Sequence, residues 1–124
     1  MMKLYLLVAL FGATGSVLRY SLFIVTPKIY YSFFPISTLL VNLIGSFLIG
    51  FFIALFDKGI ISETVRLCVV IGLLGGFTTF STFSMDMFNL INKSLYLQAS
   101  IYIFGSVVFG LILFITGHKL ASLL

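Results

Sequence analysis

Four long apolar stretches, joined by short links, constrain this chain more than any other feature. They cover about residues 4–25, 36–56, 65–90 and 96–117. A helix needs about 20 apolar residues to cross the hydrocarbon of a bilayer, so each stretch can span a membrane once. The links leave no room for a soluble domain. We therefore expect residues 1–124 to form a single domain of four transmembrane helices.

The composition supports this all-α integral membrane class. Charged residues make up 8% of the chain and hydrophobic residues 61%, whereas about a quarter of the residues of a soluble domain are charged. A β-barrel is disfavoured because its strands alternate apolar and polar positions over about ten residues, and the apolar runs here are continuous. The first stretch is also longer than the apolar region of a signal peptide, so we expect it to remain as a helix.

Several classes of function are disfavoured because the sequence lacks the residues that their chemistry needs. The single cysteine, Cys68, and the single histidine, His118, cannot build a transition-metal site on their own. No nucleophile is paired with a plausible base, so we predict that the protein is not an enzyme. The basic residues are scattered singly and do not form the stripe that binds nucleic acid.

The basic residues are almost evenly divided between the two sides of the predicted bundle. An excess of Lys and Arg in cytoplasmic loops normally sets the orientation. A near tie therefore predicts a chain that inserts both ways and pairs as an antiparallel dimer, with a single orientation, N-terminus inside, as the equal alternative. Four basic residues fall on the side of the N-terminus and three on the other: Lys3, Lys58, Arg66 and Lys119 against Arg19, Lys28 and Lys93.

Polar side chains form rows inside the predicted spans. Residues four apart share a helical face, and such rows either bond to a neighbouring helix or line a path through the membrane. Three rows together with an interrupted helix favour the path. The rows are Thr38, Asn42 and Ser46; Tyr102 and Ser106; and, in the third stretch, Ser81, Thr82 and Met85.

The chemistry of such a path favours an anion. Among the acidic residues only Asp86 falls well inside a predicted span, whereas the path offers hydroxyls, the Asn42 amide and the Arg19 guanidinium as hydrogen-bond donors. Donors without carboxylates suit a small, strongly hydrated anion. The rings of Phe80 and Phe83 can add to this, because aromatic edges carry partial positive charge.

The pair Gly75-Gly76 predicts a weak point in the third helix. A break there would free main-chain carbonyls, which can bind a hard cation such as Na⁺. The alternative is a kink that the hydroxyls of Thr78 and Thr79 relieve.

Three blocks of this sequence resemble the Fluc (CrcB) family of fluoride channels. The most specific is residues 75–84, Gly-Gly-Phe-Thr-Thr-Phe-Ser-Thr-Phe-Ser. Residues 38–47, Thr-Leu-Leu-Val-Asn-Leu-Ile-Gly-Ser-Phe, support it, as does the first-helix pattern of Gly12, Gly15 and Arg19-Tyr20. Asp86 departs from the family, which more often has Glu at that position.

The resemblance implies a dual-topology antiparallel dimer that exports fluoride passively through two pores of a bacterial cytoplasmic membrane. It also implies a structural, untransported Na⁺ at the dimer centre, held by the main-chain carbonyls of Gly75 and Thr78. The near-even charge count favours a homodimer over pairing with a paralogous subunit. The residues that resemble the fluoride pore are Asn42, Phe80, Ser81, Thr82, Phe83, Tyr102 and Ser106, with Arg19 in the vestibule.

Two other functions fit the fold class. A small dual-topology multidrug or organic-cation exporter also has four short helices, but it needs a membrane-embedded carboxylate in its substrate pocket, and the first stretch has Arg19 and no acidic residue. An accessory subunit of a larger membrane complex would show no transport alone.

Overall fold

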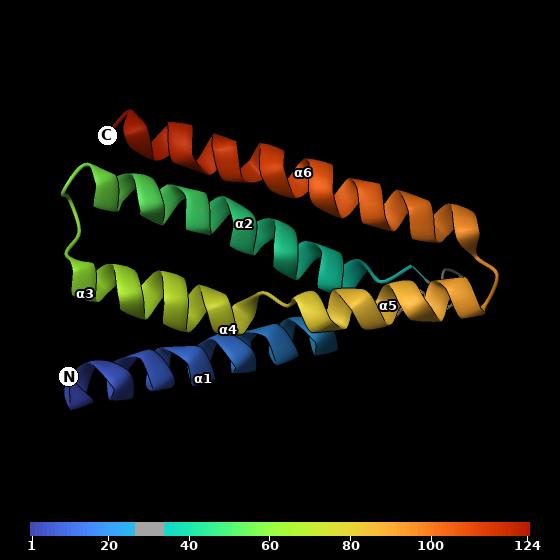
Figure 1. Cartoon of the computed structure of the whole chain (residues 1–124), viewed down its shortest axis with the longest axis horizontal. Coiled ribbons are helices and arrows are strands. Elements are labelled where there is room, and N and C mark those ends of the chain that lie inside the picture. The colour runs from blue at the N-terminus through green and yellow to red at the C-terminus, as the bar shows by residue number, and fades with distance from the viewer. Residues whose placement is uncertain (27–33) are drawn as a thin grey trace.

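The computed structural model describes residues 1–26 and 34–124. Within these residues the chain is helical and has no strand. Four helices of this part are long and apolar enough to cross a membrane: α1 (Met2–Val25), α2 (Ile36–Asp57), an interrupted third span (Glu63–Asn92) and α6 (Tyr96–Ser122). The predicted all-α membrane fold is confirmed. The N- and C-termini lie at the same end of the bundle (Figure 1).

The third span is built from four consecutive pieces. They are α3 (Glu63–Arg66), the π-helical η1 (Leu67–Leu74), α4 (Gly75–Phe77) and α5 (Phe80–Asn92). Thr78 and Thr79, between α4 and α5, have extended backbones, with φ and ψ of −75° and 159° for Thr78 and −153° and 123° for Thr79. The predicted interruption near the middle of this helix is therefore confirmed.

The position of the break differs from the one that the glycine pair suggested. Gly75 and Gly76 remain helical, and Thr78 N still donates to Leu74 O at 2.9 Å. Gly76 serves close packing, because a Cβ there would clash with the carbonyl of Gly12 on α1. Glycine lowers helix stability, but here its missing side chain lets two helices approach.

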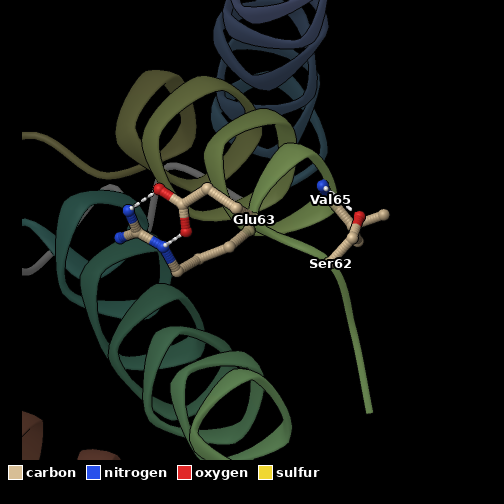
Figure 2. Close-up of polar contacts among 4 residues, drawn as sticks. Ser62, Glu63 and Val65 are labelled. Carbon is tan, nitrogen blue, oxygen red and sulfur yellow. Dashed lines mark hydrogen bonds and ion pairs between the residues drawn. The ribbon is translucent and has the colours of Figure 1, made fainter. Parts of the chain in front are cut away.

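The third span begins with a conventional helix start. Gly59 turns the chain after α2 with a φ of +70°, a conformation that glycine adopts without strain. Ser62 Oγ then caps α3 by accepting a hydrogen bond from Val65 N at 3.4 Å. Arg66 Nε donates to Glu63 Oε2 at 2.7 Å, and Figure 2 shows both contacts. This charged turn marks one end of the third span.

The helices pack in two pairs. α2 lies along α6, whereas α1 lies along η1 and α4 (Figure 1). Glycines bring the backbones together in both pairs, since a Cβ on Gly15 would overlap the carbonyl of Leu73, and a Cβ on Gly50 would overlap that of Phe114. Close approach of this kind replaces the hydrophobic effect as a source of association in lipid.

A small buried core joins the two pairs near the start of α6. Phe83, Leu90, Ala99 and Tyr102 form it. Most other large apolar side chains of α1 and α6 are exposed in the single chain. A surface of this kind belongs in lipid or against another subunit.

Candidate functional site

The break between α4 and α5 is the centre of the candidate site. A helix end leaves backbone groups without intrahelical partners, and in a membrane each such group needs another partner. Side chains from α1, α2 and the third span itself supply these partners. Each of these side chains contacts a particular main-chain group at the break.

Asn42, on α2, pairs with both main-chain groups of Thr79. Its Oδ1 accepts a hydrogen bond from Thr79 N at 2.8 Å, and its Nδ2 donates to Thr79 O at 3.0 Å. A primary amide offers an acceptor and two donors, so it can make both bonds at once. Asn42 thus holds an extended residue that belongs to neither helix.

The Thr79 hydroxyl caps α5 and gathers two further hydroxyls around it. Its Oγ1 accepts from Thr82 N at 3.2 Å and donates to Thr82 Oγ1 at 3.1 Å. Ser81 Oγ lies 3.3 Å from the same atom. Thr79 is only 8% exposed, and its amide, carbonyl and hydroxyl are all paired.

Helix α1 serves the other side of the break. Arg19 Nη1 donates to Thr78 O at 3.2 Å, and Ser16 Oγ lies 3.5 Å from Gly76 O. Both carbonyls belong to the end of the first half of the span, where a positive group is favoured by the helix dipole. Arg19, predicted as a vestibule residue, therefore contacts the break directly.

A cavity of about 300 Å³ lies beside the break. It is bounded by α2, the two threonines, α5 and α6. The Oγ atom of Ser106 is buried and has no hydrogen-bond partner among the described residues. The cavity is lined by Asn42, Ser46, Ile49, Thr78, Thr79, Phe80, Phe83, Ser106 and Val107.

Three aromatic rings lead from the surface of the cavity into the core. Phe80 is 77% exposed, Phe83 8% and Tyr102 fully buried. The ring centres of Phe80 and Phe83 are 5.8 Å apart, and those of Phe83 and Tyr102 are 5.0 Å apart. The ring planes of the two pairs are tilted against each other by 40° and 43°.

Tyr102 joins the cavity wall to the only acidic residue of α5. Its hydroxyl donates to Asp86 Oδ2 at 3.2 Å, and the side chain of Thr38 lies near the same hydroxyl. Thr38 is 3% exposed. The Asp86 carboxylate, for which the sequence suggested no partner, therefore pairs with a buried phenol.

The predicted site residues fall into two groups. Asn42, Phe80, Phe83, Ser106 and Thr78 line the cavity. Ser81 and Thr82 instead bond to Thr79, Tyr102 lies in the core, Arg19 contacts Thr78, and Gly75 is an exposed residue of α4.

Two residues of the site were missed as site residues by sequence reasoning. One is Thr79, which caps α5: its side chain accepts a hydrogen bond from the backbone amide of Thr82, three residues later. A threonine directly before a helix is a common N-cap, and this was the available signal. The other is Thr38, which the sequence placed in a polar row without a partner.

No group of three or more His, Cys, Asp or Glu side chains that could hold a metal occurs in residues 1–26 and 34–124.

Comparison with known proteins gives one consistent result. A family model described as "CrcB-like protein, Camphor Resistance (CrcB)" matches residues 6–118. The fluoride-specific ion channel FluC of Thermus thermophilus is 45% identical over 123 residues, which cover 99% of this chain and 98% of that protein. FluC of Phocaeicola vulgatus is 47% identical over 111 residues, covering 90% and 92%, and FluC of Aquifex aeolicus is 42% identical over 116 residues, covering 93% and 94%.

Proposed function

Because this chain belongs to the CrcB family, we propose that it is a fluoride-specific ion channel through which fluoride leaves the cell passively. Relatives that carry the name fluoride-specific ion channel match almost its whole length. Their activity is transport, which agrees with the predicted absence of an enzymatic function. The four membrane-spanning helices place that transport in a lipid bilayer.

The observation that carries the proposal is the donor-lined cavity at the helix break. Hydroxyls of Ser46 and Ser106 and the amide of Asn42 line it, and its described lining includes no carboxylate. Fluoride is small and strongly hydrated, so it needs hydrogen-bond donors that replace its water. The rings of Phe80 and Phe83 close one side of the cavity and can offer positive edges to an anion.

We further propose that the working unit is an antiparallel homodimer in which the two subunits insert with opposite orientations. The single chain supports this through its exposed apolar surface and through Phe80, which is 77% exposed although it lines the cavity. The balance of basic residues also supports it, although Lys28, which enters that count, lies outside the described residues. A heterodimer with a paralogous subunit is the alternative outcome.

The main chain at the break fits the structural Na⁺ that the family resemblance implies. Thr79 N donates to Asn42, so it does not serve the Gly75 carbonyl four residues earlier. Gly75 is exposed in the single chain, where a second subunit can cover it. Thr78 O, which accepts from Arg19, has a second lone pair. We propose that Gly75 and Thr78 hold the ion through these carbonyls, where it would add a fixed positive charge.

The alternative of an organic-cation exporter finds no comparable support. Such an exporter needs a carboxylate in its substrate pocket. Asp86 bonds to Tyr102 Oη and is absent from the described lining of the cavity.

Fluoride efflux from proteoliposomes that contain this chain alone tests the proposal. We expect fluoride to leave the vesicles and chloride to be retained. Phe83→Ile should reduce the efflux, whereas Phe88→Ile, on the exposed face of α5, should leave it unchanged. Equal passage of chloride, or no efflux at all, would contradict the proposed function.

Orientation can be tested separately. A single cysteine at Leu124, in a Cys68→Ser background, should be labelled by an impermeant thiol reagent in about half of the molecules in intact cells if the chain inserts both ways. Complete labelling, or none, would contradict dual topology.

A further inference from the structure

The third span breaks two residues beyond its glycines. The break lies where a backbone amide first donates to a residue outside the helix. Thr78 N still donates to Leu74 O. In a continuous helix the next amide, Thr79 N, would donate to Gly75 O. It donates instead to Asn42 Oδ1 at 2.8 Å. A side chain of α2 thus accepts the hydrogen bond that a continuous helix would form within itself.

Asn42 makes hydrogen bonds to both the amide and the carbonyl of Thr79. It accepts from the amide and also donates to the carbonyl at 3.0 Å, as a neighbouring β-strand would. A carboxylate of similar size would offer acceptors only. Both bonds are partly buried, so loss of the Asn42 side chain would leave polar groups unpaired at membrane depth.

The face of α2 that carries Asn42 fits the break over more than one turn. Gly45 leaves room for the side chain of Thr78, whose Cγ2 atom occupies the space that a Cβ on Gly45 would need. Thr38, one turn before Asn42, lies near the hydroxyl of Tyr102. α2 is itself held in place by packing along α6. Its contacts with Thr78 and Thr79 therefore fix the position of the break relative to the α2–α6 pair.

We propose that Asn42 is a positioning residue that holds the third span open. It leaves the Gly75 carbonyl without its helical donor, and it sets where α5 restarts with Phe80. Asn42 therefore acts on the anion path through Phe80, and on the cation site through Gly75. The second action rests on the proposed function, whereas the first concerns the fold of the break itself.

A backbone substitution separates this role from that of an anion ligand. Replacing the amide of residue 79 by an ester, through semisynthesis, removes Thr79 N–H and leaves every side chain in place. The readouts are fluoride efflux and the ¹⁹F resonance of 4-fluorophenylalanine at position 80. Asn89→Ala, an exposed asparagine of α5, is the matched control.

We expect the ester to lower efflux about fivefold and Asn42→Ala about tenfold, because a partly buried hydrogen bond contributes about 1 kcal/mol. The combined variant should fall no further than Asn42→Ala alone, since both changes remove the same contact. Both should shift the Phe80 resonance, and Asn89→Ala should not. Normal efflux and an unshifted resonance in the ester protein would overturn the proposal, even if Asn42→Ala fails to fold.

Thermal unfolding in Na⁺ against unfolding in a large organic cation tests the action on Gly75. Asn42→Ala frees Thr79 N–H to return to the Gly75 carbonyl, so the stabilisation by Na⁺ should weaken. The ester has no hydrogen to return, but its carbonyl is that of Thr78 and is a weaker ligand than an amide carbonyl. The ester protein is therefore the reference, and adding Asn42→Ala to it should weaken the stabilisation by Na⁺ no further. A loss on Asn42→Ala that is the same with and without the ester, or no loss at all, would overturn this action.

Failure of the proposed function gives a different pattern. If the unmodified protein passes no fluoride but the Phe80 resonance responds as expected, the channel proposal fails and the positioning role stands. If Na⁺ does not stabilise the unmodified protein, the cation proposal fails and the resonance still decides on Asn42.

Discussion

The two halves of the third span meet at one break and present opposite helix poles to it. The first half, residues 63–77, ends there with carbonyl oxygens, and Arg19 donates to the carbonyl of Thr78 beside it. Phe80–Asn92 begins there with amide hydrogens and a hydroxyl cap. A helix carries partial negative charge at its C-terminus and partial positive charge at its N-terminus. One break can therefore favour a cation on one side and an anion on the other.

Each side of the break depends on a different neighbouring helix. α1 brings its donors to the carbonyl side through Ser16 and Arg19. α2 serves the amide side through Asn42. Asn42 acts on both sides, but variants of other residues can disturb one side at a time.

The largest effect is expected from Gly76→Ala, which breaks the carbonyl side. The new Cβ would overlap the carbonyl of Gly12, so α1 must move away and carry Arg19 from Thr78. Overpacking of this kind costs about 2 kcal/mol. Thermal unfolding in detergent should show the loss of stability.

Gly105→Ala is the matched control for this variant. Its Cβ would meet only a ring atom of Phe109 at 3.8 Å, an ordinary contact. Both alanines gain the same helix propensity, so the difference between them isolates the clash. Equal stability of the two proteins would show that α1 does not need this close approach.

Removal of the cap from the amide side should have a smaller effect. Thr79→Val keeps the shape of the side chain but loses the hydroxyl that accepts from Thr82 N. Loss of an N-cap costs about 1 kcal/mol, and α5 should fray at Phe80. We expect lower fluoride efflux and a lower unfolding temperature. Thr79→Ser keeps the hydroxyl and should restore both; a serine protein as impaired as the valine protein would argue against capping.

The sequence predicted the parts of this site that depend on composition and on local pattern. The four spans follow from hydrophobic runs alone, and the interruption of the third follows from Gly75-Gly76 and the hydroxyls after it. The exact place of the break does not follow, because it depends on a contact between Asn42 and Thr79, 37 residues apart. Local propensity pointed to the glycines, and a tertiary hydrogen bond placed the break after them.

Tertiary packing also explains the roles that were not predicted. Asp86 and Tyr102 are 16 residues apart and meet only because α5 packs on α6. By spacing, Ser81 and Thr82 belong to a polar row. In the structure their hydroxyls hydrogen-bond to the side chain of Thr79, the N-cap of α5. Spacing shows which residues share a helix face, whereas the packing of the helices determines what that face contacts.

Arg19→Gln should sharpen the electrostatic difference between the two sides. The variant keeps donor capacity near Thr78 O but removes the positive charge. We expect fluoride efflux to fall about threefold, and the Na⁺ concentration needed for thermal stabilisation to fall as well, because a like charge beside a cation opposes its binding. Arg66→Gln is the control, since Arg66 pairs with Glu63 at the start of the span. A higher Na⁺ requirement in Arg19→Gln would contradict this assignment.

The smallest effect is expected from Ser62→Ala, which removes the other N-cap of the same span. Ser62 Oγ accepts from Val65 N at 3.4 Å (Figure 2). Both residues are exposed. At a membrane surface water can replace this bond, so we expect a loss of about 0.5 kcal/mol or less. Thermal unfolding of Ser62→Ala and Thr79→Val under the same conditions makes the comparison. A larger loss for Ser62→Ala would mean that the surface turn, and not the buried break, limits the stability of the third span.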